Sequence, residues 1–139
     1  MTTGYQIAKS KLGLHENKNT KELDVFISKY VPAWKGLHVN TTAWCAGFIG
    51  ACEKVAGNTG TGKLNARSYL TYGTSIPIQQ AQQGDIAIFS RGGSSWQGHV
   101  AYIDKIISPK LLQTIGGNQS DSVSIGWYPI NRLIGIRRP

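Results

Sequence analysis

The sequence contains little negative charge, since only 7 Asp and Glu stand against 15 Lys and Arg in 139 residues. The formal net charge of +8 favours an anionic partner, such as nucleic acid, lipid headgroups or an acidic cell-wall polymer. The cations are scattered, with Arg137-Arg138 as the only dense pair, and the sequence contains no motif typical of nucleic-acid-binding domains. We therefore expect no nucleic-acid partner.

Long apolar runs are also lacking. No stretch approaches the roughly 20 apolar residues that a membrane-spanning helix needs, so we expect no stable membrane insertion. The segment Met1–Tyr5 lacks the basic and then apolar pattern of a secretory signal. We expect synthesis in the cytoplasm without a signal peptide, followed by release to any target outside it. Repeats and low-complexity tracts are absent, and we expect one monomeric domain over residues 1–139.

Cysteine is scarce, and the two that occur cannot form a disulfide framework. Cys45 and Cys52 fall on one predicted helix, seven residues and therefore about 10.5 Å apart along its axis. A disulfide needs Cα atoms within about 7 Å, and bonds from zinc to sulfur are only about 2.3 Å long. We predict no metal site and no cofactor, and we assign Cys52 to core packing.

The predicted cysteine helix lies between Thr41 or Thr42, either of which can cap its start, and Gly57-Asn58, which can stop it. Apolar residues recur within it at spacings of three and four and predict a buried stripe: Trp44, Phe48, Ile49, Cys52 and Val55.

Cys45 falls in the first turn of this helix, where free backbone N–H groups and the helix dipole favour a thiolate and lower the thiol pKa. Its small neighbours Ala43, Ala46 and Gly47 leave room for a substrate. Cys45 is therefore a candidate nucleophile, although a cysteine taken at random is usually a small buried apolar residue.

The remaining elements change from helical to strand periodicity along the chain. Helices are predicted over residues 5–14, from Asn19 or Thr20 to Tyr30, and over 66–72. Strands are predicted over 85–89, 99–107, 110–115, 122–128 and 132–137. Short connections such as Ser108-Pro109 require antiparallel neighbours. The order of elements predicts an α+β fold, with the helices packed on an antiparallel sheet.

The hairpin around Ser108-Pro109 provides a candidate base. A turn centred there places His99 opposite Asn118, where side chains of one face lie about 4.5–5.5 Å apart at Cβ. The Asn118 oxygen can then accept from one ring nitrogen of His99 and leave the other for a thiol, which is the arrangement that an activated nucleophile requires. Gly116-Gly117 can introduce a bulge into this register. The alternative for His99 is a histidine that serves only the strand end.

Four segments in order resemble the CHAP group of cysteine, histidine-dependent amidohydrolases/peptidases. They are Trp44–Phe48, Gly84–Phe89, Gly98–Ala101 and Gly116–Gln119, and the similarity extends from about Ile7 to the C-terminus. The group is related to NlpC-type cell-wall peptidases, which have a papain-like fold.

The resemblance implies a cysteine peptidase or amidase that hydrolyses bacterial peptidoglycan, either a murein endopeptidase or an N-acetylmuramoyl-L-alanine amidase. Cys45 would be its nucleophile, His99 its base and Asn118 the residue that orients the base. Compact, basic domains of this kind resemble phage or prophage endolysins, which a membrane-permeabilising protein releases to the wall or periplasm. The sequence departs from many wall lysins in having no separate wall-binding domain. It also has no acidic residue over Gly36–Trp44, where some CHAP domains carry a calcium loop.

Four further residues are candidate substrate contacts, and roles outside the substrate groove are predicted for Asp85 and for the backbone of Cys45. We expect Trp34, His38, Trp96 and Tyr102 to line the substrate groove, with Trp96 foremost because it lies on a Gly/Ser-rich loop just before His99. Aromatic side chains are, however, more often part of the core. Asp85 is expected to hold the turn before its strand, and the Cys45 backbone N–H is a candidate oxyanion donor.

Two other functions stay open at this stage. One is a non-catalytic module that binds the wall or another polyanion through its positive charge. The other is a toxin-type cysteine acyl transferase or deamidase that acts on a protein. The sequence does not identify the bond that is cleaved, the target species or the origin of the protein.

Overall fold

The computed structural model describes residues 2–139. The helices in this part of the chain are α1 (Gly4–Ser10), α2 (Thr20–Tyr30) and α3 (Cys45–Val55), with short 3-10 helices η1 (Pro32–Trp34), η2 (Ala66–Thr71), η3 (Ile78–Gln80) and η4 (Ile130–Arg132). The strands are β1 (Thr74–Ser75), β2 (Ile86–Ser90), β3 (Gly98–Ser108), β4 (Leu111–Gln119), β5 (Ser122–Pro129) and β6 (Leu133–Arg138).

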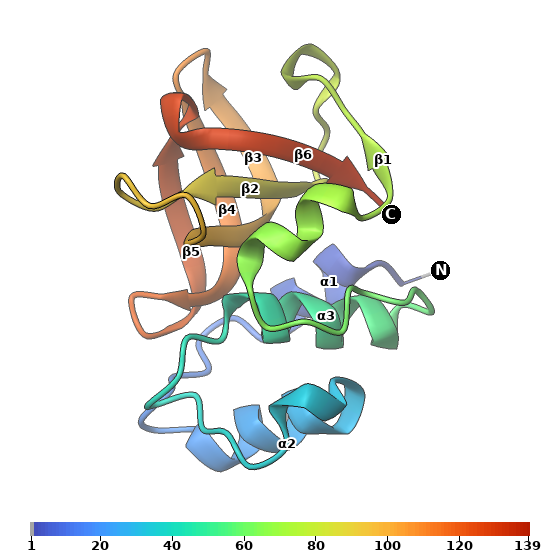
Figure 1. Ribbon diagram of the computed structural model, residues 1–139, viewed down its shortest axis with the longest axis vertical. Helices are drawn as coiled ribbons and strands as arrows, with labels where there is room; N and C mark the ends of the chain where they lie inside the picture. The colour runs from blue at the N-terminus through green and yellow to red at the C-terminus, as the bar shows by residue number, and fades with distance from the viewer. Residues whose placement is uncertain (1) are drawn as a thin grey trace.

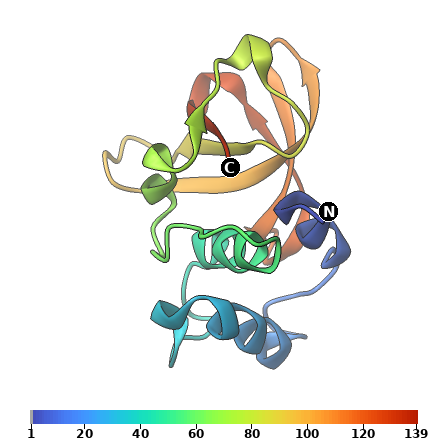
Figure 2. The same ribbon diagram turned by 90° about the vertical axis from the view of Figure 1, so that its right-hand side faces the viewer.

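The helices and the strands form separate layers. The strands make one antiparallel sheet in the order β1-β6-β2-β3-β4-β5. Helix α3 lies between this sheet and α2, as both views show (Figures 1 and 2). This architecture confirms the predicted α+β class, with helices packed on an antiparallel sheet.

Helix α3 is the central element of the core. Every residue from Cys45 to Glu53 is buried, because α1 and α2 cover one side of the helix and β3 and β4 the other. A helix enclosed in this way is apolar all round rather than along one stripe. Gly47 lets α2 approach closely, since a Cβ there would lie 3.2 Å from a methyl group of Ile27. Val55, predicted for the buried stripe, is 38% exposed at the end of the helix.

Several element boundaries differ from the predicted ones. Trp44 occupies the N-cap position of α3 without a side-chain cap, so a Thr41 or Thr42 cap is wrong. The backbone N–H groups of both threonines instead donate to the carbonyl of His38 in the preceding turn. The two-residue strand β1 is too short to be detected from the sequence, and β4 extends beyond Ile115 to Gln119.

Two buried carboxylates connect distant parts of the fold. Glu53 of α3 accepts hydrogen bonds from the Tyr72 and Tyr102 hydroxyls, at 2.8 and 2.7 Å. Asp85 accepts from the Gln82 backbone N–H and pairs with the guanidinium of Arg138, which confirms its predicted role in the turn. Within residues 2–139, no helix has the length and apolar character needed to cross a bilayer.

Candidate active site

Cys45 is the first residue of α3, and its sulfur lies beside β3. Backbone N–H groups of Val100 and Ala46 act on the sulfur and favour the thiolate, so the thiol is next to the residue that follows His99. The thiol has little exposed surface, and burial raises its pKa. The nearby backbone N–H groups and the positive charge of Arg91 only partly oppose this effect. The expectation of a thiol pKa lowered at the helix N-terminus is therefore wrong, because desolvation of the thiolate outweighs the effect of the backbone N–H groups.

His99 is the second residue of β3 and pairs across the sheet with Phe89 of β2. Its ring is buried and stacks on Tyr128 of β5, with centroids 4.9 Å apart and an interplanar angle of 27°. Its Nε2 atom lies 2.8 Å from Oε1 of Gln119. Stacking and this hydrogen bond together fix both the plane and the rotation of the imidazole.

The hydrogen bonds of Gln119 determine which nitrogen of His99 carries the proton. The Gln119 amide nitrogen donates to the carbonyl of Ser124 at 2.7 Å, and a carbonyl can only accept. Gln119 Oε1 therefore faces His99, and it also accepts from the Thr114 hydroxyl at 2.9 Å. His99 Nε2 must then be the protonated nitrogen, which leaves Nδ1 as the acceptor for a thiol proton.

The polar partner of His99 is thus Gln119 rather than the predicted Asn118. The pairing of β4 with β5 shifts by one residue between Gly116 and Gln119, and Asn118 has a φ of 62° in the left-handed region. One extra residue in a strand reverses the alternation of its side chains. Gln119 consequently shares the face of Thr114, and Asn118 makes no hydrogen bond to His99 in the described structure.

The bulge is held against the cysteine helix by close packing. A Cβ at Gly117 would lie 2.5 Å from the indole of Trp44, so only glycine permits this contact. The Trp44 indole N–H in turn donates to Glu16 at 3.0 Å. The residue before Cys45 and the segment that carries Gln119 are therefore fixed relative to each other.

The sequence of this region also identifies the family. A family model described as the CHAP domain matches residues 37–118, which is well over half of the chain. The chain belongs to the CHAP domain family. The matched span contains Cys45 and His99, and it ends one residue before Gln119. The papain-like arrangement expected from the resemblance, a cysteine helix packed on an antiparallel sheet that carries the histidine, is the one observed.

The CHAP domain is also similar to solved structures of NlpC/P60 proteins. An NlpC/P60 family protein from Bacillus cereus is 20% identical with a TM-score of 0.47, over 68% of this chain and 31% of that one. An NLP/P60 family protein similar to a lipoprotein, from Staphylococcus aureus, is 20% identical with a TM-score of 0.49, over 85% of this chain and 41% of that one. The peptidoglycan hydrolase RipB from Mycobacterium tuberculosis is 14% identical with a TM-score of 0.48, over 94% of this chain and 69% of that one. The chain spans less than half of the length of the first two. No curated protein matches the chain.

Two arginines make the CHAP site electropositive. Arg91 follows β2 directly, and Arg132 donates from Nε and Nη2 to the carbonyl of Ser90, the last residue of β2. The Arg132 guanidinium also lies 5.6 Å from the centroid of Tyr128, the ring that stacks on His99. Desolvation by burial is the main cause that lowers the pKa of His99 to about 4, and the charges of both arginines act in the same direction. The hydrogen bond to Gln119 raises this pKa and opposes them only in part. The resting site holds a neutral imidazole beside a neutral thiol.

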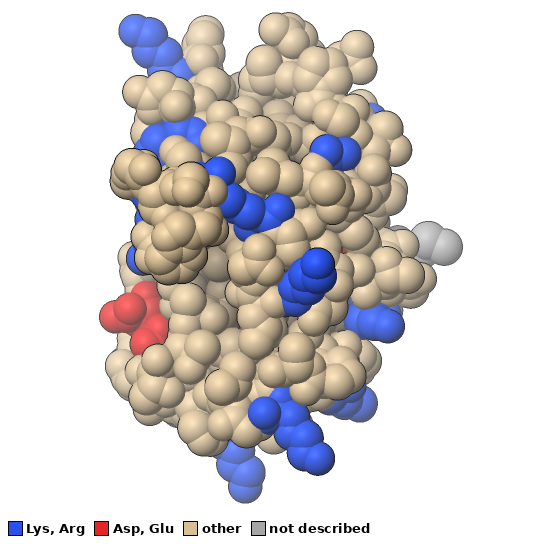
Figure 3. All heavy atoms as spheres, viewed as in Figure 1, with Lys and Arg blue, Asp and Glu red and all other residues tan. Residues whose placement is uncertain are grey.

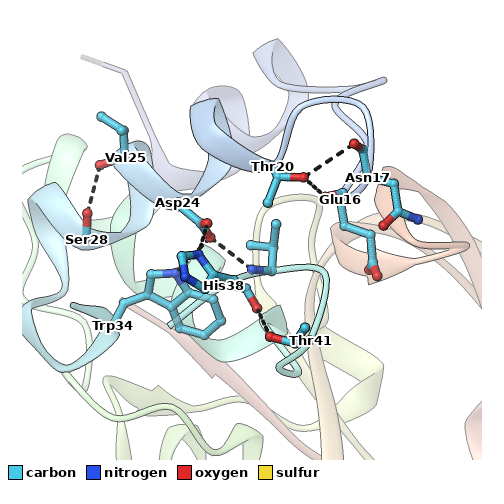
Figure 4. A network of polar contacts seen from close by, with 10 residues as sticks. Glu16, Asn17, Thr20, Asp24, Val25, Ser28, Trp34, His38 and Thr41 are labelled. Atoms are coloured by element: carbon cyan, nitrogen blue, oxygen red, sulfur yellow. Dashed lines mark hydrogen bonds and ion pairs between the residues drawn. The ribbon is translucent and has the colours of Figure 1, made fainter. Parts of the chain in front are cut away.

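Two of the predicted substrate contacts belong to the core of the CHAP domain. Trp34 and Tyr102 have no exposed surface, so the prediction that they line the groove is wrong. The Trp34 indole N–H donates to Asp24, which also pairs with the exposed His38 at 2.8 Å (Figure 4). The rings of Trp34 and Tyr102 therefore serve core packing. Trp96, by contrast, is 72% exposed on the loop between β2 and β3.

The sequence analysis missed four residues around the base: Gln119, Tyr128, Arg91 and Arg132. Gln119 could have been identified from the sequence, because it ends the last of the segments on which the family resemblance rests. The other three come from β5, the β2–β3 loop and the end of η4, and no spacing in the sequence connects them to His99. Among residues 2–139, no group of three or more His, Cys, Asp or Glu side chains is arranged as a metal site.

Proposed function

We propose that this CHAP domain is a peptidoglycan hydrolase, which cleaves an amide or peptide bond of the bacterial wall by thiol catalysis. Cys45 is the nucleophile, His99 the general base and Gln119 the positioning residue. The observation that carries the proposal is the orientation of His99. Its Nε2–H is fixed on Gln119, so its Nδ1 is free to accept a proton beside a thiol at the start of a helix.

The reaction follows from these roles. His99 Nδ1 removes the proton of the Cys45 thiol as the sulfur attacks the carbonyl carbon of the scissile bond, and the carbonyl oxygen becomes an oxyanion. The backbone N–H of Cys45 has no intrahelical acceptor, because it is the first of α3, and it can donate to this oxyanion. The C–N bond then breaks as His99 gives the proton to the leaving amine, and water activated by His99 hydrolyses the thioester.

The neutral pair explains why Gln119 matters. As the proton moves from sulfur to nitrogen, His99 becomes an imidazolium in a buried site, and the hydrogen bond from Nε2 to Gln119 Oε1 strengthens because its donor is now charged. Arg91 stabilises the thiolate and the oxyanion that form at the same time. The site is therefore organised for the charged transition state rather than for a resting ion pair.

The wall as substrate is supported by membership in the CHAP family and by charge. Lys and Arg side chains are spread over the face in Figure 3, where acidic groups gather only at the left edge. The net charge of +8 favours encounter with an anionic polymer. We propose that residues 1–139 act as one monomeric catalytic domain of a phage or prophage endolysin. In this proposal the domain is made in the cytoplasm and released to the wall.

The decisive test is the digestion of purified peptidoglycan, with mass spectrometry of the soluble fragments. The wild-type chain is expected to generate new amino termini on muropeptides, and their identity distinguishes an endopeptidase from an amidase. Cys45→Ala and His99→Ala should each abolish release, because attack requires both the sulfur and the base. Circular dichroism verifies that both variants are folded. Release at the wild-type rate by Cys45→Ala, or deamidation of proteins without any release from the wall, would refute the proposal.

A further inference from the structure

The most exposed large apolar side chain in the described structure, Trp96, lies close to the catalytic histidine in the chain. It is 72% exposed, on the loop between β2 and β3, and His99 follows it by three residues. The same loop begins with Arg91, whose charge acts on both Cys45 and His99. Tryptophan is enriched at binding surfaces, because its ring offers an apolar face and its indole N–H a hydrogen-bond donor.

The loop that carries Trp96 is braced rather than loose. Arg67 of η2 donates from Nε to the carbonyl of Gln97 at 2.7 Å and from Nη2 to the carbonyl of Ser94 at 2.9 Å. The Ser94 hydroxyl accepts from the backbone N–H groups of Trp96 and Gln97, at 3.2 and 3.1 Å. These four hydrogen bonds hold the carbonyls and amides on both sides of Trp96. A braced loop loses less conformational entropy when a ligand binds.

The side chains around Trp96 are polar. Arg91, Ser95 and Gln97 are exposed on the same loop, and the hydrogen bonds of the structure leave their side chains without a protein partner in the described residues. A flat aromatic ring with neighbouring guanidinium, hydroxyl and amide groups matches a pyranose, which has an apolar C–H face and a rim of hydroxyl and acetamido groups. A peptide strand would instead require a sheet edge or an apolar groove.

We propose that Trp96 is a sugar-binding platform, on which a pyranose ring of the wall glycan stacks while the attached stem peptide enters the site of Cys45 and His99. This assignment rests on the proposed function, because it names the part of peptidoglycan that the β2–β3 loop contacts. Arg67 is a positioning residue for the platform. The glycan thereby orients the stem peptide before chemistry begins.

The test is a binding experiment in the Cys45→Ala background, so that no turnover occurs. The probes are soluble glycan strands stripped of their stem peptides and, separately, the free stem peptide. The indole N–H resonance of Trp96 should shift with the glycan strands and not with the free peptide. Adding Trp96→Ala should weaken binding of the strands about three- to tenfold, the range expected for loss of one stacking contact.

A matched control is available in Trp127, which is 57% exposed on β5 and alternates with Tyr128, so it lies on the opposite face of that strand from the ring on His99. Trp127→Ala should leave glycan binding unchanged. Arg67→Ala should weaken binding while Trp96 is present, and relaxation of the Trp96 indole N–H should show greater mobility on the nanosecond timescale.

The outcomes separate this inference from the proposed function. Equal affinity of the Trp96→Ala and Trp127→Ala variants for the glycan strands, or a Trp96 resonance that moves only with the free peptide, would overturn the platform while leaving hydrolysis intact. If the wild-type chain releases nothing from peptidoglycan and yet binds glycan strands through Trp96, the hydrolase proposal fails and the platform stands.

Discussion

Replacement of Gln119 by methionine tests the central feature of the site. Methionine keeps the length and much of the volume of the side chain, but its thioether sulfur is only a weak acceptor for the hydrogen bond from His99 Nε2. In the ground state that bond joins two neutral groups, whereas in the transition state its donor is an imidazolium. A hydrogen bond to a charged group contributes about 1.5–3 kcal/mol, so kcat/KM should fall about 10- to 150-fold.

The pH profile distinguishes positioning from a general loss of structure. The hydrogen bond to Gln119 raises the pKa of His99, so its removal should move that pKa below its wild-type value of about 4. The acidic limb of kcat/KM should then shift to lower pH even though the plateau has fallen. Release of amino groups from purified peptidoglycan between pH 3 and pH 8 measures both effects, and thermal unfolding at each pH confirms that the variant is folded.

Asn118→Gly is the matched control for Gln119→Met. It removes the side chain that the sequence predicted as the partner of His99, and glycine adopts the φ of 62° at this position without strain. This variant should retain nearly wild-type activity. If Asn118→Gly loses more activity than Gln119→Met, the orienting group is Asn118 after all, and the tautomer assigned from the Gln119 hydrogen bonds is wrong.

Three further predictions concern pH, thiol reactivity and salt. Wild-type kcat/KM requires neutral His99, so it should be fully present above about pH 5 and decline as the pH falls through about 4; a limb near the ordinary histidine pKa of about 6.5 would contradict the burial argument. Brief alkylation at neutral pH should label Cys45 and spare Cys52, since Cys52 is fully buried and its pKa is raised much further; peptide mapping with the label mainly on Cys52 would refute this. EDTA should leave activity intact, and inactivation by EDTA that zinc reverses would refute a metal-free thiol mechanism. Hydrolysis of intact wall should slow as ionic strength rises from low to physiological values, because screening weakens the attraction of the basic chain to the polymer, and a flat profile would show that the charge does not serve capture.

The sequence was sufficient for features that depend on local periodicity. Apolar residues at helical spacing predicted α2 and α3, and short runs rich in strand-forming residues predicted β2, β3 and β5 close to their observed bounds. Cys45 also came from its position at a helix start, and His99 from the register of the hairpin that set it opposite Asn118. These are short-range properties, which the order of a few neighbouring residues determines.

Tertiary structure decided what depends on the packing of distant segments. The bulge in β4 exchanged Asn118 for Gln119, because one inserted residue reverses which side chains face His99. Burial showed that Trp34 and Tyr102 belong to the core and that Trp96 belongs to the surface, a distinction that aromatic composition does not contain. Burial likewise raised the pKa of Cys45, since the cost of desolvating a thiolate depends on every segment packed around it. The sequence of the cysteine helix indicated only the helix dipole, which would lower that pKa.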